Sequence, residues 1–200
     1  MGLLSDRGII GRIKRREKDP MRLRISDFSP KLVKEAGKPS WGLSCYGYDC
    51  RLAPEFCYVD TMALAQRDKP YLEPGEPAPW VTVESPFWVL PPGGFIMART
   101  MEYMRIPRDC GATVYGKSTY ARLAVCLNTT LLEPEWEGTV TLEISNIGNF
   151  PVCLKAGHGI CQVVFNTAAS AKGPLSLRTS YADRAHPTYQ YQKSVTLSKV

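Results

Sequence analysis

The chain has 200 residues, close to the usual size of one domain and long enough to bury a substantial core. Hydrophobic residues make up 44% and charged residues 22% of it, and no uncharged apolar run approaches the roughly 20 residues that cross a membrane. We therefore expect a globular protein that does not span a membrane. The formal net charge of +6 suits an anionic ligand but does not separate a nucleotide from a nucleic acid.

The first residues predict a short helix. Ser5 and Asp6 can cap its start, and Ile9, Ile10 and Ile13 fall on one face at helical spacing. The stretch lacks a long apolar run followed by a small-residue cleavage site, so we expect no signal peptide and a cytoplasmic protein. The basic run that follows, "RIKRREKDPMRLR", could touch nucleic acid, but a solvated helix end explains it better and we expect no nucleic-acid partner.

After this helix, short β-branched and aromatic runs alternate with frequent glycine and proline. The runs are "FCYVD", "WVTVES", "FWVL", "GFIMART", "ATVYG", "TVTLEIS", "PVCLK" and "GICQVVF". Many short strands separated by turns are typical of an all-β sandwich or barrel. No internal repeat or low-complexity linker divides the chain, so residues 1–200 are interpreted as one domain. Residues 180–200 are polar, aromatic and interrupted by proline, as in a tail that orders against another surface.

The cysteines and histidines argue against a zinc site. The sequence has seven cysteines but no C-x-x-C and no H-x-E, and His158 and His186 are far apart. A tetrahedral zinc ion needs three or four converging ligands, so we predict no metal ligands in this chain. Most cysteines have apolar or aromatic neighbours, and the simplest interpretation is buried free thiols.

One strand can be read residue by residue. In "TVTLEIS", Val140, Leu142 and Ile144 fall on one face, whereas Thr141 and Glu143 share the other face with Thr139 and Ser145. A glutamate in a strand usually faces solvent, so Glu143 gains interest only if its face lines a pocket.

The stretch "GATVYGKS" (111–118) satisfies the phosphate-binding pattern G-x-x-x-x-G-K-[ST]. That loop requires a buried strand before the first glycine and a helix after the lysine. Here the preceding "RIPRDC" is loop-like and "ATVY" has the composition of a strand. We therefore reject a nucleoside triphosphatase loop, although the lysine and hydroxyls can still bind phosphate on another scaffold.

Several stretches in the same order make the chain resemble the dCTP deaminases of the dUTPase-like superfamily over nearly its whole length. The stretches are "SCYGYDCRL", "PPGGFIMARTMEYMRIPRD", "GKSTYAR", "LNTTLLEPEWEGTVTLEISN", "GICQVVF" and "SYADR...YQYQKSVTL". The resemblance implies an all-β, distorted β-barrel of the dUTPase-like, β-clip type, assembled as a homotrimer with active sites between subunits. It also implies that residues 180–200 order over the nucleotide.

The same resemblance implies a reaction. The substrate is dCTP, carried with Mg²⁺, and water replaces its 4-amino group without zinc to give dUTP and ammonia for thymidylate synthesis. dTTP is a candidate inhibitor. Replacing an amine with water needs one group that moves protons and donors for developing charge.

The site residues are carried over position by position. Glu143 matches the family's catalytic glutamate and is expected to act first as general base and then as general acid, with Ser118 and Arg122 near the reacting centre. Backbone groups of Thr141 and Leu142 are expected to read the base, and "EPEW" (133–136) to border the sugar. The full predicted substrate-binding set is Lys117, Ser118, Thr119, Tyr120, Ala121, Arg122, Glu133, Thr141, Leu142, Glu143, Gln162, Tyr181 and Gln192.

Two positions depart from the family pattern, and two alternative functions stay open. Thr188 stands where the family tail usually has lysine, with Lys193 as a substitute, and Ala124 stands where glycine is common. A bifunctional enzyme that also releases diphosphate would give dUMP, but Glu133 and Trp136 replace the aspartate and tyrosine of the diphosphatase motif. A non-catalytic nucleotide-binding regulator needs phosphate contacts but no proton shuttle.

Overall fold

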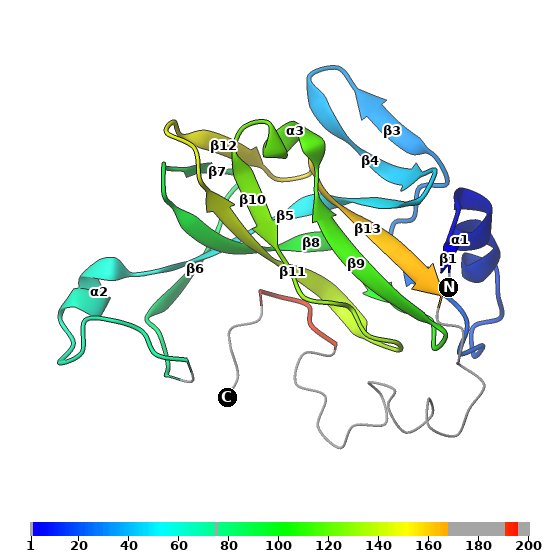
Figure 1. Cartoon of the computed structure of the whole chain (residues 1–200), viewed down its shortest axis with the longest axis horizontal. Helices are drawn as coiled ribbons and strands as arrows, with labels where there is room; N and C mark the ends of the chain where they lie inside the picture. Colours follow the sequence, from blue (N-terminus) through cyan, green and yellow to red (C-terminus); the bar gives the residue numbers. More distant parts are fainter. Residues whose placement is uncertain (1, 75, 168–190, 196–200) are drawn as a thin grey trace.

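The computed structural model describes residues 2–74, 76–167 and 191–195, and strands dominate these residues (Figure 1). None of the helices in these ranges is long and apolar enough to cross a membrane. In chain order the elements are β1 (Gly2–Leu3), α1 (Asp6–Ile13), β2 (Arg24–Ile25), β3 (Leu32–Glu35), β4 (Lys38–Ser44), β5 (Gly47–Val59), α2 (Thr61–Ala65), β6 (Trp80–Glu84), β7 (Phe87–Leu90), β8 (Phe95–Arg105), β9 (Cys110–Gly116), α3 (Ser118–Ala121), β10 (Val125–Asn128), β11 (Glu137–Asn146), β12 (Val152–Lys155) and β13 (Gly159–Thr167).

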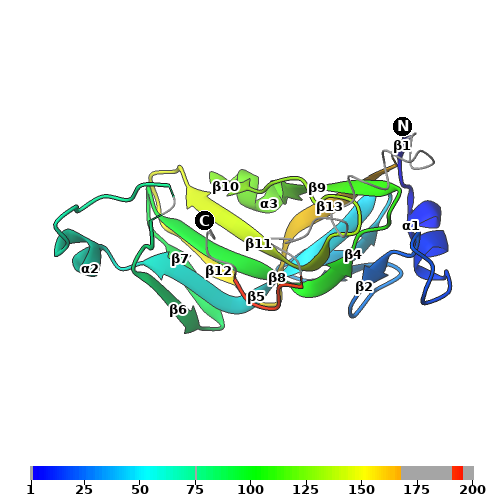
Figure 2. The same cartoon turned by 90° about the horizontal axis from the view of Figure 1, so that it is seen from below.

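Among these residues, eleven strands form one large sheet and β7 pairs separately with β12. The path β1-β13-β5-β8-β11-β10 runs through the large sheet, with β9 on β13 and β4 and β6 on β5. Seen from below, the sheet curls like half of a barrel (Figure 2). The predicted all-β, barrel-like architecture is therefore confirmed, and all eight predicted strand runs lie in strands.

The long strand β5 takes part in both halves of the large sheet. Its first half pairs with β4 and β13, both through Asp49, and its second half pairs with β6 and β8, both through Phe56. The register with β8 shifts between Leu52 and Phe56, and Pro54 lies in this interval. Proline has no amide hydrogen to donate to a neighbouring strand, so it fits such an irregularity.

Strand β11 lies between β8 and β10 and carries the predicted catalytic residue. Its side chains alternate as expected: Val140, Leu142 and Ile144 are buried in the core, whereas Glu143 is half-buried on the opposite face. Thr139 is also buried, because the carboxyl-terminal segment lies against this end of the strand. The alternation predicted from the sequence therefore positions Glu143 outside the main core.

The amino-terminal helix α1 forms where it was predicted. The Ser5 hydroxyl accepts a hydrogen bond from the backbone N–H of Gly8 at 3.3 Å, and Ile9 is buried in the core. The basic run differs from the expectation of a solvated helix end, because Arg12 forms a two-pronged ion pair with Asp109. Arg12 therefore ties α1 to the start of β9.

The glycine-lysine stretch also has the predicted conformation. Residues 112–115 lie in β9, which pairs with β13, so "ATVY" is a strand and not a phosphate-binding loop. The helix that follows Lys117 has only four residues. The seven cysteines all fall in the described ranges and are free thiols; Cys50, Cys57, Cys110 and Cys161 are buried, and Cys45, Cys126 and Cys153 are exposed.

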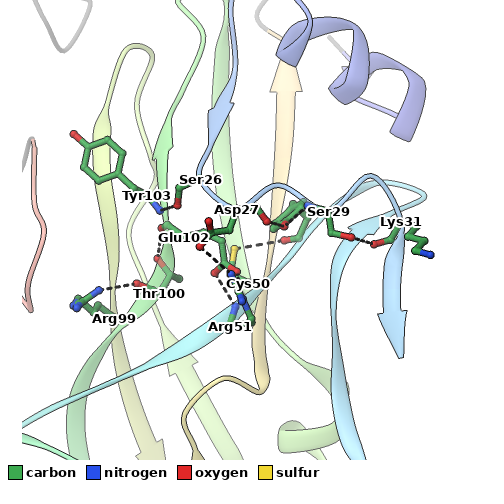
Figure 3. Close-up of polar contacts among 11 residues, drawn as sticks. Ser26, Asp27, Ser29, Lys31, Cys50, Arg51, Arg99, Thr100, Glu102 and Tyr103 are labelled. Carbon is green, nitrogen blue, oxygen red and sulfur yellow. Dashed lines mark hydrogen bonds and ion pairs between the residues drawn. The ribbon is translucent and has the colours of Figure 1, made fainter. Parts of the chain in front are cut away.

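A buried charge pair joins β5 to β8 (Figure 3). Glu102 accepts hydrogen bonds from the Nε and the backbone N–H of Arg51, at 2.7 and 2.8 Å. The guanidinium of Arg51 also lies 4.1 Å from the centre of the Trp41 ring. Burial raises the pKa of the Glu102 carboxyl, and the bonds from Arg51 oppose that rise. The pair stabilises the alignment of the two strands from inside the fold.

Candidate active site

The "GKSTYAR" stretch is a one-turn helix at the end of β9. Lys117 precedes α3, its backbone N–H donates to the carbonyl of Ile160 at 3.0 Å, and Arg122 ends the turn. Tyr120 is buried and anchors the turn to the core, and burial raises the pKa of its phenol. Ser118 is exposed, as are Thr119, Ala121 and Arg122. The turn therefore holds its polar side chains on the surface around one buried anchor.

Lys117 differs from its neighbours because its charge is already paired. Its Nζ forms an ion pair with Oδ2 of Asp49 on β5, and the two side chains are only 13% and 7% exposed. Gln162 on β13 lies opposite Asp49 in the strand register, and its Nε2 donates to Ser44 Oγ at 2.8 Å. Lys117 therefore pairs with a carboxylate that sequence analysis did not identify, and Gln162 lies opposite that carboxylate's residue on the neighbouring strand.

A second group forms on β11. Glu143 accepts a hydrogen bond at its Oε2 from Nδ2 of Asn128 on β10, at 2.9 Å. Leu142 is fully buried through its side chain, so only its backbone can contribute to a site, as the resemblance implies. Strand β10 covers the edge of β11 from Glu143 onward. The half-buried carboxylate thus has a neutral amide as a neighbour.

The carboxyl-terminal residues 191–195 lie against the first half of β11, on the edge that β10 covers further along the strand. The carbonyl of Gln192 accepts from the backbone N–H and the hydroxyl of Thr139, at 2.8 and 3.2 Å, and its side-chain Oε1 accepts from the Thr141 hydroxyl at 3.3 Å. Val195 is buried, and its backbone N–H donates to Glu55. This segment therefore brings the predicted residue Gln192 to Thr141, two residues from Glu143. Tyr181 and Thr188 lie outside the described residues.

The "EPEW" stretch contributes mostly to the structure. Trp136 is only 5% exposed and packs in the core. Glu135 is buried and pairs with Arg108 through two hydrogen bonds of 3.0 and 3.1 Å. Glu133 is half-buried at the start of this turn. Pro134 is half-buried as well, so the first two residues of this stretch keep the partial burial expected at the edge of a site.

Two groups of predicted residues therefore occupy different parts of one chain, with β10 between them (Figure 1). One group contains Lys117 to Arg122 and Gln162; the other contains Thr141, Leu142, Glu143 and Gln192. Together they offer a carboxylate that can move protons, hydroxyl donors, and cations for phosphate. In the described ranges, no three or more His, Cys, Asp or Glu side chains converge in a way that could hold a metal ion.

Sequence reasoning missed Asp49 and Asn128. Asp49 precedes Lys117 by 68 residues, and only the pairing of β13 with both β5 and β9 brings them together. Asn128 comes at the end of a four-residue strand with no alternating pattern. Asn128 could have been found only from its position opposite Glu143. That position depends on the strand register, which cannot be predicted from the sequence alone.

Known proteins are similar to this chain over most of its length. A family model described as dCTP deaminase-like matches residues 3–168. The chain is 44% identical over 176 residues to a dCTP deaminase from Paramagnetospirillum magneticum, which covers 88% of this chain and 90% of that protein. It is 43% identical over 167 residues to a dCTP deaminase from Granulibacter bethesdensis, with 84% and 86% covered.

A solved structure agrees in fold. The 2'-deoxycytidine 5'-triphosphate deaminase from Agrobacterium tumefaciens matches with a TM-score of 0.58 at 20% sequence identity, over 84% of this chain and 48% of that one. The family model covers most of the chain, and both relatives are more than 40% identical to it. The chain belongs to the dCTP deaminase-like family.

Proposed function

We propose that the protein hydrolyses the 4-amino group of dCTP, giving dUTP and ammonia. The observation that carries the proposal is that Glu143 is a half-buried carboxylate on the face of β11 opposite the core, and the resemblance matches this residue to the family's catalytic glutamate. Relatives named dCTP deaminase, 42 to 44% identical over most of the chain, support the same chemistry. Such an enzyme would supply dUTP for thymidylate synthesis in the cytoplasm.

The proposed reaction needs only proton transfers around one carbon. Water attacks C4 of cytosine, and Glu143 takes the proton that the water loses and delivers it to N3. Glu143 then takes the proton of the new C4 hydroxyl and delivers it to the amino group, which leaves as ammonia while the C4 carbonyl forms. Ser118 donates a hydrogen bond at this centre, and Arg122 stabilises developing negative charge.

The triphosphate enters as its Mg²⁺ complex, so the metal ion belongs to the substrate. Arg122 is exposed, and its Nη1 donates to the Ser118 carbonyl at 3.3 Å, so its other donors can bond phosphate oxygens. Lys117 reaches the same oxygens only by sharing or leaving its ion pair with Asp49. Phosphate binding therefore competes with an internal carboxylate. Thr119 adds an exposed hydroxyl to this surface.

We also propose that the site is completed in a homotrimer. Because β10 lies between Ser118 and Glu143 within one chain, a second copy can supply the missing side of the pocket. Residues 180–200, including Tyr181, form the tail that orders over the nucleotide as part of a single unit of residues 1–200. The hydrogen bond between Gln192 and Thr141 supports this role for the tail.

One assay separates the proposal from its alternatives. The purified protein is incubated with dCTP and Mg²⁺, ammonia is quantified, and the nucleotides are separated by ion-exchange chromatography. Ammonia with an equal amount of dUTP supports deamination alone. dUMP would assign the bifunctional reaction, and bound nucleotide without ammonia would assign a regulator and overturn the proposal. Repeating the assay with dTTP tests inhibition by that nucleotide.

A further inference from the structure

Asn128 is the side chain that holds Glu143. It is the last residue of β10, and its Nδ2 donates to Oε2 of Glu143 at 2.9 Å. The two residues lie directly opposite in the antiparallel pair. Directly opposite side chains have Cβ atoms about 4.5 to 5.5 Å apart, a span that an amide and a carboxylate bridge without strain. The contact therefore follows from the strand register and not from a chance side-chain conformation.

The register that creates this contact is fixed at its far end. Val125 pairs with Asn146, and both residues are buried. The Asn146 side chain donates to the carbonyls of Leu90 and Phe150, at 3.1 and 2.8 Å. A slip of one residue along β10 would move Val125 out of its buried position opposite Asn146 and turn the side chains of β10 to the other face. The position of Asn128 is thus set by the buried pair of Val125 and Asn146 at the other end of the strand pair.

The chemistry of the contact fits a proton shuttle. A carboxylate has two oxygens, and the amide bonds to Oε2, so we assign the proton transfer to Oε1. The bond also limits rotation about the terminal bond of the glutamate side chain, which orients the acceptor lone pairs. An amide carries no charge, so it orients the base without neutralising it as an arginine or lysine would.

We propose that Asn128 is a positioning residue for catalysis, which orients Glu143 for proton transfer without touching the substrate. The inference rests on the proposed deamination. It predicts that removing the amide slows turnover and leaves nucleotide binding nearly intact, because the phosphate and base contacts lie on other residues.

The test compares Asn128→Ala and Asn128→Asp with the unchanged protein in steady-state dCTP deamination. Misplacement of a reacting group by about 1 Å costs about 100-fold, so we expect kcat for Asn128→Ala to fall by about 10- to 100-fold with KM within about twofold. Asn128→Asp should fall further, because a carboxylate placed opposite Glu143 repels it. Cys126→Ala is the matched control: Cys126 is exposed two residues earlier on the same strand, and its variant should keep normal kcat.

A double-mutant cycle shows whether Asn128 acts through Glu143. In a Glu143→Gln background, Asn128→Ala should cause no further loss of turnover, and thermal unfolding of all variants should match the unchanged protein. Normal kcat in Asn128→Ala alongside an inactive Glu143→Gln would overturn this inference and leave the proposed function standing. Absence of ammonia release from dCTP by the unchanged protein would instead overturn the proposed function, and full turnover in Glu143→Gln would overturn the role of Glu143 in it. A rise in KM without a fall in kcat would assign Asn128 to substrate binding and contradict the positioning role.

Discussion

The two parts of the candidate site use opposite electrostatic designs. At the end of β9, Lys117 is buried against Asp49, so a cation and an anion satisfy each other before any ligand arrives. On β11, Glu143 has the neutral amide of Asn128 as its donor. The first arrangement holds a binding group in place at the cost of part of its charge. The second orients a carboxylate through a donor that carries no charge of its own.

The largest effect on activity is expected from a change at Glu143, the carboxylate of the second region. Glu143→Gln keeps the shape and the hydrogen-bonding size of the side chain but removes its ability to accept a proton. Positioned general acid-base groups contribute about 10²- to 10⁴-fold, so we expect kcat for dCTP deamination to fall by at least that factor. Calorimetric titration with dCTP should give a dissociation constant within about threefold of the unchanged protein, and a much weaker one would assign Glu143 to binding instead.

Asp49→Ala tests the charge-paired region. The change leaves the Lys117 ammonium buried without its carboxylate, and breaking a buried pair costs about 3 to 5 kcal/mol of unfolding free energy. Urea denaturation followed by tryptophan fluorescence measures this loss. The double variant Asp49→Leu with Lys117→Met removes both charges and should recover most of the stability. If Asp49→Ala alone unfolds at the original urea concentration, the pair contributes little.

A smaller effect is expected at the carboxyl-terminal segment. Gln192→Ala removes the amide that accepts from Thr141, and one hydrogen bond contributes about 0.5 to 1.5 kcal/mol. KM for dCTP should rise by roughly 2- to 12-fold with kcat nearly unchanged. Thr139→Val is the matched control, because it loses only the hydroxyl bond to the Gln192 carbonyl. An unchanged KM in Gln192→Ala would separate this residue from the substrate.

The smallest expected effect is a pH dependence of stability far from both regions. Burial, with help from the charges of Lys155 and Lys38, lowers the pKa of His158 below 6.5. The unfolded chain therefore binds this proton more readily, so the contribution of His158 to stability is present above pH 6.5 and is lost as the pH falls below it. His158→Gln should flatten the decrease in melting temperature from pH 7 to pH 5. An equal decrease in both proteins would exclude this residue as its source.

The sequence predicts strands better than it predicts which strands meet. Alternation positioned Glu143 correctly, because period-two patterns depend on neighbouring residues alone. The pairs Lys117–Asp49 and Asn128–Glu143 depend on strand register and on pairings between distant segments, which local composition does not encode. The same limit explains why the short strand β10 was missed although the longer strands on either side of the site were predicted.

The prediction for the basic run near the amino terminus was wrong for a different reason. Composition suggested a solvated helix end, but Asp109 offers Arg12 a bidentate partner that is nearly 100 residues away in sequence. A charged residue can be interpreted from local sequence only when its partner is also local. The helix around it was predicted correctly, because the Ser5 cap and the isoleucine spacing lie within one short segment.

The double role of β5 has a consequence for how the molecule opens. Because β5 hydrogen-bonds to β4 and β13 in one half and to β6 and β8 in the other, it has a partner strand on both sides, and we expect its amides to exchange slowly with solvent deuterium. The separate pair of β7 and β12 can fray by itself. The strand that carries Asp49 therefore links the two halves of the large sheet through its own backbone.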